Sequence, residues 1–504
     1  MTGSGPGRRL RRLAVAAAAA VLLAAVGQAA AAAPVQAGVS RTSITVDRAH
    51  PFSRLPADFV GLSYEMRELA SWCTTGDCTG NFDARTGNLV ALYKNLGKSN
   101  VRIGGNQLDR DTLWLPAGQQ APNPLPDWVK DIVTPADIAR FDQLLKETGW
   151  KAEVGINLAH YDANLAADEA RNLFAILGPR LSGAACGNEP NHYASNHYRP
   201  APYGYLEHKR DWEACADVVG STRMAAPDLS SPTSTADWFD QFAQAEHNRI
   251  NMLTIHNYTG ATTIGQLLSP EVYARQLNNI ARQLATAKAL QVPIRLDETN
   301  SAVGGGIAGV SDVYASGLWA MDYNLELAQA GFSGVNFHGG FGVCGAPLFN
   351  GRFQRYTPIC AANEQDAQAK IYKAMPEYYG LYMATQMGPG VFLPVTVSSD
   401  HNITAYAVHG DDGHTRIALI DKEETSGASI PVSIHVGGVG NAAIMRLTGR
   451  SLDSAEGVAI QGATVDRNGH LNPNPCDHVR IHDGLVNLDL ASGSAVVITL
   501  DGHA

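Results

Sequence analysis

Two glutamates stand at the ends of short apolar runs and could carry out acid–base or nucleophilic chemistry. Glu189 lies in Cys186-Gly-Asn-Glu-Pro190, and Glu298 lies in Ile294-Arg-Leu-Asp-Glu-Thr-Asn-Ser301. Each run reads as a buried strand that ends in a carboxylate. A pair of carboxyl groups can break a glycosidic bond, because one protonates the leaving oxygen while the other attacks the sugar or activates water. The pair therefore predicts chemistry on a sugar, provided that the fold brings the two strand ends together.

The residues beside the two glutamates favour a division of roles between them. Asn188 precedes Glu189, and its amide could bind the sugar hydroxyl next to the reacting carbon. We expect Glu298 to be the nucleophile and Glu189 the acid/base of a retaining enzyme, whose carboxyl groups stand about 5–5.5 Å apart. Because successive side chains of a strand point to opposite faces, we expect Asp297 to point away from the site, into the layer between strands and helices.

Strand and helix patterns alternate eight times along the chain, which predicts an α/β fold. The expected strands cover residues 59–65, 100–106, 152–158, 181–189, 223–228, 252–258, 293–299 and 334–338. The expected helices cover residues 89–96, 135–148, 168–177, 203–219, 236–245, 270–290, 312–330 and 367–387. Eight such units predict a closed (β/α)8 TIM barrel with its site at the carboxyl ends of the strands. An open, doubly wound sheet is the alternative, but no glycine-rich phosphate fingerprint accompanies the pattern.

Polar residues end the predicted strands, as a site at that edge of a barrel requires. They are Glu65, Asn106, Asn157, Glu189, Asp228, His256, Glu298 and His338. After Pro394 the composition changes to short alternating strands separated by Gly, Asp and Asn, which predicts a C-terminal β-sandwich. The domains expected are a signal peptide at 1–37, an N-terminal strand at 38–50 that joins the β-domain, the barrel at 51–392 and the β-sandwich at 393–504.

The first residues and the net charge limit where the protein acts and on what. Four arginines between Arg8 and Arg12 precede an Ala-rich apolar run, which predicts a secretory signal peptide and an extracellular protein. A membrane anchor is the alternative, but the run is shorter than the roughly 20 residues that a span needs. The net charge of −10 argues against nucleic acid as a partner. We expect a carbohydrate substrate and no membrane partner after cleavage, and the sequence does not predict an oligomeric state.

Seven cysteines in an exported chain allow disulfide bonds. Cys73 and Cys78 enclose a tight polar loop and are the first expected pair, and Cys344 and Cys360 bracket one long loop and are the second. Two others, Cys186 and Cys215, could pair or remain buried thiols, which leaves Cys476 as the odd one. No Cys/His spacing is typical of a zinc site, and we expect neither a metal nor a cofactor.

Three segments are specific in combination: 187–190 (Gly-Asn-Glu-Pro), 297–312 (beginning Asp-Glu-Thr-Asn-Ser) and 335–340 (Val-Asn-Phe-His-Gly-Gly). Together they resemble glycoside hydrolase family 79, which contains β-glucuronidases and heparanases. The resemblance extends over nearly the whole mature chain and implies Glu189 as acid/base and Glu298 as nucleophile. It further implies that Glu65 contacts sugar hydroxyls and that Tyr356 helps to hold a uronate carboxylate. Tyr258 matches the strand-six tyrosine near the nucleophile and His338 the strand-eight histidine, so both are expected to bind substrate.

Because of two departures from the family pattern, the sequence does not decide which sugar is the substrate. Val303 stands where glucuronidases of the family carry a second tyrosine, and the loop 339–355 is longer. Arg352 and Arg355 could supply the lost donor. The first hypothesis is an exo-β-glucuronidase, the second a retaining β-glycosidase for a neutral sugar such as a glucoside or galactoside, and the third a non-catalytic glycan-binding protein. The acidic balance and the lack of clustered Lys and Arg argue against endo-cleavage of a sulfated chain.

Overall fold

The computed structural model describes residues 41–347, 354–423 and 428–501. The expected signal peptide and Arg352 lie outside these residues. Within them, no helix is both long enough and apolar enough to cross a membrane.

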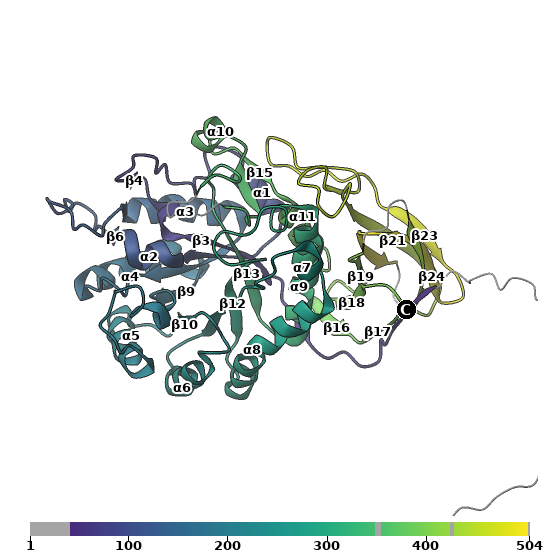
Figure 1. Ribbon diagram of the computed structural model, residues 1–504, viewed down its shortest axis with the longest axis horizontal. Coiled ribbons are helices and arrows are strands. Elements are labelled where there is room, and N and C mark those ends of the chain that lie inside the picture. Colours follow the sequence, from purple (N-terminus) through teal and green to yellow (C-terminus); the bar gives the residue numbers. More distant parts are fainter. Residues whose placement is uncertain (1–40, 348–353, 424–427, 502–504) are drawn as a thin grey trace, which may run out of the picture. The chain divides into compact units, whose positions relative to one another are not determined.

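Eight parallel strands close into a barrel, which confirms the predicted TIM-barrel fold (Figure 1). Around the barrel the strands are β3 (Val60–Glu65), β5 (Asn100–Gly104), β8 (Lys151–Ile156), β9 (Leu181–Cys186), β10 (Met224–Leu229), β11 (Met252–His256), β12 (Ile294–Thr299) and β13 (Gly334–Gly339). β13 pairs with β3 and closes the ring, with Phe337 opposite Leu62. Nearly every residue of these strands is buried, as expected when helices cover the outside of a parallel sheet.

Nine α-helices of the described chain precede β13, and several of them begin at a capping side chain. They are α1 (Leu89–Asn95), α2 (Gly105–Asp111), α3 (Pro135–Thr148), α4 (Ala163–Leu177), α5 (Tyr205–Val219), α6 (Ala236–Glu246), α7 (Ile264–Leu267), α8 (Pro270–Leu290) and α9 (Tyr314–Ala330). At α3, Thr134 and Asp137 form a reciprocal capping box around Pro135. At α8, the Ser269 side chain accepts from the Val272 backbone N–H.

The last predicted helix, 367–387, is wrong as a single element. The chain forms β14 (Ile359–Ala361), α10 (Glu364–Gln368), β15 (Tyr372–Ala374) and α11 (Pro376–Thr385) in that order, and β14 pairs with β15 across α10. Pro376 explains the break, because proline disfavours a helical conformation in the residue before it and starts a helix well. Only the second half of the predicted helix, from Pro376 onward, therefore forms a helix of the expected kind.

Two further sheets pack face to face as the predicted β-sandwich. One has the order β17 (Val395–Ser398), β1 (Thr42–Val46), β20 (Ser429–His435), β24 (Leu485–Ala491). The other has the order β2 (Arg54–Leu55), β16 (Gly390–Leu393), β18 (Ile403–Gly410), β19 (Thr415–Asp421), β25 (Ala495–Leu500), β21 (Gly440–Thr448), β22 (Ala459–Ile460), with β23 (Asp477–Ile481) beside β21. Ile44, Ile417, Val432 and Ile498 belong to the core between them. The N-terminal strand β1 thus completes a sheet made otherwise of C-terminal strands.

A buried ionic cluster joins the barrel to the sandwich. Asp322 of α9 accepts from Lys422 Nζ at 2.6 Å, from the Tyr406 hydroxyl at 2.6 Å and from Thr404 Oγ1 at 2.8 Å. Lys422 Nζ also lies 4.3 Å from the ring centroid of Tyr273 on α8. Loss of one partner would leave an uncompensated buried charge, so the cluster holds α9 in a defined position against β18 and β19.

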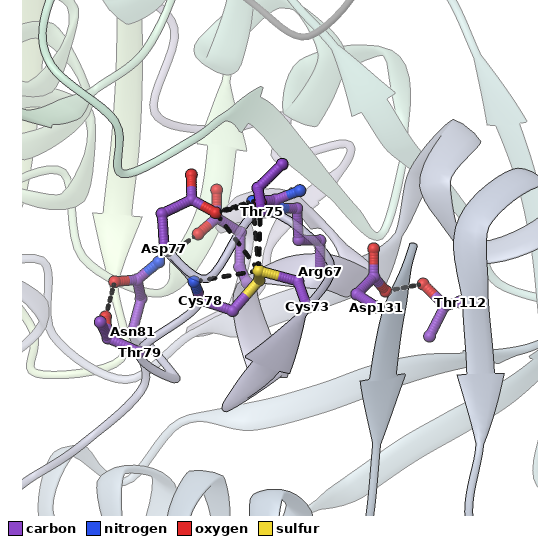
Figure 2. Close-up of a disulfide and its surroundings, with 10 residues drawn as sticks. Arg67, Cys73, Thr75, Asp77, Cys78, Thr79, Asn81, Thr112 and Asp131 are labelled. Atoms are coloured by element: carbon purple, nitrogen blue, oxygen red, sulfur yellow. Dashed lines mark hydrogen bonds and ion pairs between the residues drawn. A yellow bond between two sulfur atoms is a disulfide. The ribbon is translucent and has the colours of Figure 1, made fainter. Parts of the chain in front are cut away.

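All seven cysteines lie in the described part of the chain, and six of them pair. Cys73–Cys78 and Cys344–Cys360 form as expected, and Cys476 is free. Figure 2 shows Arg67, Thr75 and Asp77 gathered around the first disulfide. The pair left open by the sequence, Cys186–Cys215, is also a disulfide. It ties the end of β9 to α5 close to the position of Glu189.

Candidate active site

The two glutamates meet at the carboxyl ends of β9 and β12. One carboxylate oxygen of Glu189, one of Glu298 and a ring nitrogen of His256 all lie within 4.8 Å of one another. The Glu298 side chain is 5% exposed and that of Glu189 is 16% exposed. The separation is close to the roughly 5–5.5 Å of retaining glycosidases, and too short for the water that inverting enzymes hold between their carboxyl groups.

Positive and hydrogen-donating groups surround Glu298. Its oxygens accept from Arg102 Nη1 at 2.6 Å and from the Tyr258 hydroxyl at 2.8 Å, and His338 Nδ1 lies 3.8 Å away. Burial by itself would raise the pKa of Glu298, but the charges of His338, His256 and Arg102 outweigh it and hold the pKa well below its usual value. Glu298 is therefore ionised and suited to attack an electrophilic carbon.

Glu189 is held in a conformation that side chains rarely adopt. Its φ of 46° lies in the left-handed region, just before the short helix η3 (Pro190–His192). The Glu189 N–H donates to the Asp228 carbonyl at 3.0 Å, and the preceding Asn188 N–H donates to Asp109 Oδ2 at 2.8 Å. Such strained residues concentrate at functional sites, where the surrounding structure maintains them. The Glu189 carboxylate then lies 2.9 Å from His256 Nδ1.

The structure brings the other predicted site residues into the same cluster. Asn188 Oδ1 accepts from Arg102 Nη2 at 2.6 Å. Glu65 Oε1 lies 3.8 Å from His338 Nε2. The Tyr356 ring lies 5.9 Å from the Tyr258 ring and 6.1 Å from the His338 ring, between centroids. Glu65 and Tyr356 therefore both lie beside His338, which is itself close to Glu298.

Two polar residues expected at strand ends have supporting positions instead. Asn106 lies inside α2, and its Oδ1 is 3.5 Å from Asn188 Nδ2. Asn157 Nδ2 donates to the Leu108 carbonyl at 2.9 Å and so ties the end of β8 to α2. Both hold the rim of the barrel.

Arg102 stands at the centre of the site, and sequence reasoning missed it. Besides Glu298 and Asn188, its guanidinium lies 3.4 Å from Asp228 Oδ2 and 3.6 Å from Asp297 Oδ2, and the residue is 1% exposed. The available signal was an arginine in the middle of the apolar strand 100–104, because a charge there must be paired. His256 was noted only as a strand end, although it contacts Glu189.

The expected orientation of Asp297 is wrong. Its carboxylate lies inside the barrel, 3.4 Å from His256 Nε2. The strand β12 changes register against β13 between Leu296 and Thr299, and against β11 between Thr254 and His256. Such a bulge breaks the alternation of side chains, so the adjacent residues Asp297 and Glu298 both reach the interior.

Two overlapping sets of side chains could ligate a metal ion. One is Glu189, His256 and Glu298, and the other is Asp228, His256 and Asp297. The Arg102 guanidinium contacts a carboxylate of each set and already supplies positive charge there. The arrangement therefore suits organic acid–base chemistry better than a cation site.

Glu153 on β8 is a buried acid whose carboxylate oxygens have no hydrogen-bond partner among the described residues. Burial, together with the negative charges of Asp297 and Asp228, raises its pKa well above the usual value. The folded state therefore binds this proton more tightly than the unfolded chain does, and stability falls as the pH rises above about 4.3, the unfolded value.

Glu153→Gln is expected to stabilise the protein at pH 7 by about 1–3 kcal/mol, because the amide cannot ionise. The gain should vanish near pH 4, where Glu153 is protonated in both states. Urea unfolding at the two pH values measures the difference. Glu147→Gln, on the exposed face of α3, is the control and should change stability by less than about 0.5 kcal/mol at either pH. A gain that is equal at both pH values would contradict the expectation.

The loop after β12 contains the departure at Val303, whose side chain is 66% exposed. The Gly305 carbonyl in this loop accepts from the backbone N–H groups of Arg355 and Tyr356, at 2.6 and 3.1 Å. Gly306 has a φ of 91°, and a Cβ there would come within 2.7 Å of the Tyr356 nitrogen. Glycine is thus required for the loop to hold the segment that carries Tyr356.

The chain is similar in sequence to two fungal β-glucuronidases. That of Neurospora crassa is 23% identical over 449 residues, which cover 77% of this chain and 76% of that protein. That of Aspergillus niger is 25% identical over 285 residues, or 50% of this chain and 49% of that protein. No family model matches the chain.

Solved structures share its fold. A 4-O-α-L-rhamnosyl-β-D-glucuronidase from Fusarium oxysporum 12S has a TM-score of 0.73 at 21% identity, over 91% of this chain and 100% of that one. A family 51 arabinofuranosidase from Xanthomonas axonopodis pv. citri has a TM-score of 0.66 at 14% identity, over 92% of this chain and 100% of that one. These likenesses show that the chain shares its fold with both of these proteins.

Proposed function

We propose that the protein is a secreted, retaining exo-β-glucuronidase of the family 79 type. The close approach of Glu189 and Glu298 carries the proposal, since a pair at this separation is equipped for double displacement. The β-glucuronidase relatives support the sugar. Disulfides support an extracellular location, where such bonds persist.

The reaction proceeds in two steps with Glu298 as nucleophile. In the first, Glu298 attacks the anomeric carbon while Glu189 gives its proton to the leaving glycosidic oxygen, and a glycosyl ester forms. In the second, Glu189 takes a proton from water, the water oxygen attacks the same carbon, and Glu298 leaves as carboxylate. Asn188, held by Arg102, is positioned to bind the hydroxyl beside that carbon, where bonds strengthen in the transition state.

Two further residues, both beside His338, are assigned to the sugar's remaining groups. Glu65 is a hydrogen-bond acceptor for sugar hydroxyls, and Tyr356 is a donor for the uronate carboxylate. A retaining β-glycosidase for a neutral sugar is the second candidate, because the position of a second carboxylate-binding tyrosine is taken by the exposed Val303.

Assays on nitrophenyl β-glycosides separate the candidates. Hydrolysis of the glucuronide with little hydrolysis of the glucoside and galactoside is the expected result, and Glu298→Gln provides the inactive control. Activity on a neutral glycoside alone would overturn the glucuronidase proposal. No activity on any sugar would favour a binding protein.

The anomeric configuration should be retained. Proton NMR of the first product formed from a β-glucuronide is expected to show the β-anomer before mutarotation. The reason is that two successive inversions at one carbon restore its configuration. An α-anomer as first product would contradict the role of Glu298 as nucleophile.

A further inference from the structure

A histidine ring connects the acid/base to a second carboxylate that the reaction scheme leaves unused. His256 Nδ1 lies 2.9 Å from Glu189 Oε1, and the other ring nitrogen, Nε2, lies 3.4 Å from Asp297 Oδ2. Both His256 and Asp297 are fully buried. The three side chains come from the end of β9 and from the adjacent strands β11 and β12.

Asp297 depends on its cationic neighbours. Neither of its oxygens has a hydrogen-bond partner in the described part of the chain, and its close contacts are His256 and Arg102. A buried carboxylate without hydrogen bonds is costly unless a positive charge compensates it. Arg102 is shared with Glu298, Asn188 and Asp228, whereas the imidazole of His256 contacts both Asp297 and Glu189.

We propose that Asp297 is a positioning residue for Glu189 that acts through His256. Its carboxylate orients the ring and keeps a proton on it, so the Glu189–His256 pair retains the proton needed by the leaving group to higher pH. The inference rests on the proposed role of Glu189 as acid/base. In the first step the pair gives one proton to the glycosidic oxygen, and in the second it takes one from water. Asp297 itself contacts the ring and takes no part in either proton transfer.

The charges around the ring favour this state. Burial lowers the pKa of His256, but the charges of Glu298 and Asp297 and the close contacts of the ring with Asp297 and Glu189 outweigh it and raise the pKa. The ionisable groups that face His256 are Glu189, Asp228, Asp297, Glu298 and Arg102. Those that face Asp297 are His256, Arg102, Arg295, Glu153 and Asp228. The positive charge of Arg102 opposes protonation of the His256 ring, but the four acidic groups that face the ring favour it.

The pH profile of Asp297→Asn tests the proposal. The alkaline limb of kcat/KM reports loss of the proton from the pair in the free enzyme. We expect it to move to lower pH by roughly one unit, the usual effect of one nearby buried charge. Asp142→Asn is the matched control, because it removes another buried carboxylate, paired with Arg180 at 2.7 Å, that does not contact His256. Its alkaline limb should stay within about 0.3 units of the wild type.

An NMR titration of the His256 ring in nitrogen-15-histidine-labelled protein gives a second readout that needs no catalysis. The ring should lose its proton at lower pH in Asp297→Asn than in the wild type, with His256→Gln assigning the signal. An unchanged titration and an unchanged alkaline limb would overturn the role of Asp297 and leave the glycosidase proposal intact. A wild type inactive on every glycoside would overturn the proposed function, and the titration would still decide whether Asp297 holds the ring proton.

If Asp297→Asn does not fold, His256→Gln carries the kinetic test. Removal of the imidazole should lower the alkaline limb by a similar amount. A limb at the wild-type position would overturn the proposal.

Discussion

Glu298→Gln is expected to lower kcat on an aryl β-glucuronide by at least about 10⁴-fold, since the amide cannot form the glycosyl ester. The variant should still fold, because an amide oxygen can accept from Arg102 Nη1 in place of the carboxylate. The loss is measured by steady-state kinetics on a preparation in which contamination by wild-type enzyme is excluded. A loss of less than about 100-fold would contradict the nucleophile assignment.

Glu189→Gln is the informative comparison for that loss. Nitrophenolate leaves without protonation, so this variant should form the glycosyl-enzyme at a useful rate from the activated substrate. It should lose much more activity on a glucuronide with an alkyl alcohol as leaving group, whose oxygen needs a proton to depart. Glu298→Gln should be equally inactive on both substrates. If the two variants responded alike to the leaving group, the division of roles would be wrong.

Replacement of Arg102 by methionine should have the second largest effect, on both stability and activity. The change leaves Glu298, Asp297 and Asp228 without the guanidinium that contacts all three. Breaking a buried ion pair from one side costs about 3–5 kcal/mol. The destabilisation should be larger at pH 8 than at pH 5, because the abandoned carboxylates can be neutralised only by protonation. Thermal unfolding at the two pH values measures it.

Two matched variants separate charge from geometry. Arg102→Lys keeps the charge but loses the fork that reaches Glu298 and Asn188 together, so it should recover stability more than kcat/KM. Arg54→Met removes an arginine from an exposed pair with Asp411 and should cost less than about 1 kcal/mol. Equal losses in Arg102→Met and Arg54→Met would contradict the central role of Arg102.

The barrel could be predicted because its signals are local. Buried strands alternate with helices, and some of these helices begin at a capping residue such as Ser269 or Thr134. Eight repeats of a strand and a helix are typical of a closed (β/α)8 barrel. The carboxylates at the strand ends were predictable for the same reason, since the carboxyl ends of parallel strands share one rim. The error at 367–387 came from reading apolar spacing across Pro376 without its effect on the preceding backbone.

The orientation of side chains inside the barrel could not be predicted in the same way. Whether Asp297 faces inward depends on a register shift between neighbouring strands, which no pattern within 294–299 reveals. Arg102 and His256 belong to the site only because residues far apart in the chain surround them. An arginine in a buried strand indicates that acidic partners must lie nearby. Which residues these partners are can be known only once the strands are arranged in the barrel.

The place of β1 in the sandwich has a consequence for the order of synthesis. The register sets Ile44 beside Ile434 and opposite Val397, so one of the first strands to be made pairs with some of the last. The barrel strands are all translated in between. Until the C-terminal residues arrive, Ile44 and Val46 belong to an apolar strand with both edges unpaired, which is a template for aggregation. A chain that ends before β20 therefore leaves one edge of β1 unpaired, so a truncation near one end of the chain creates an aggregation-prone strand at the other.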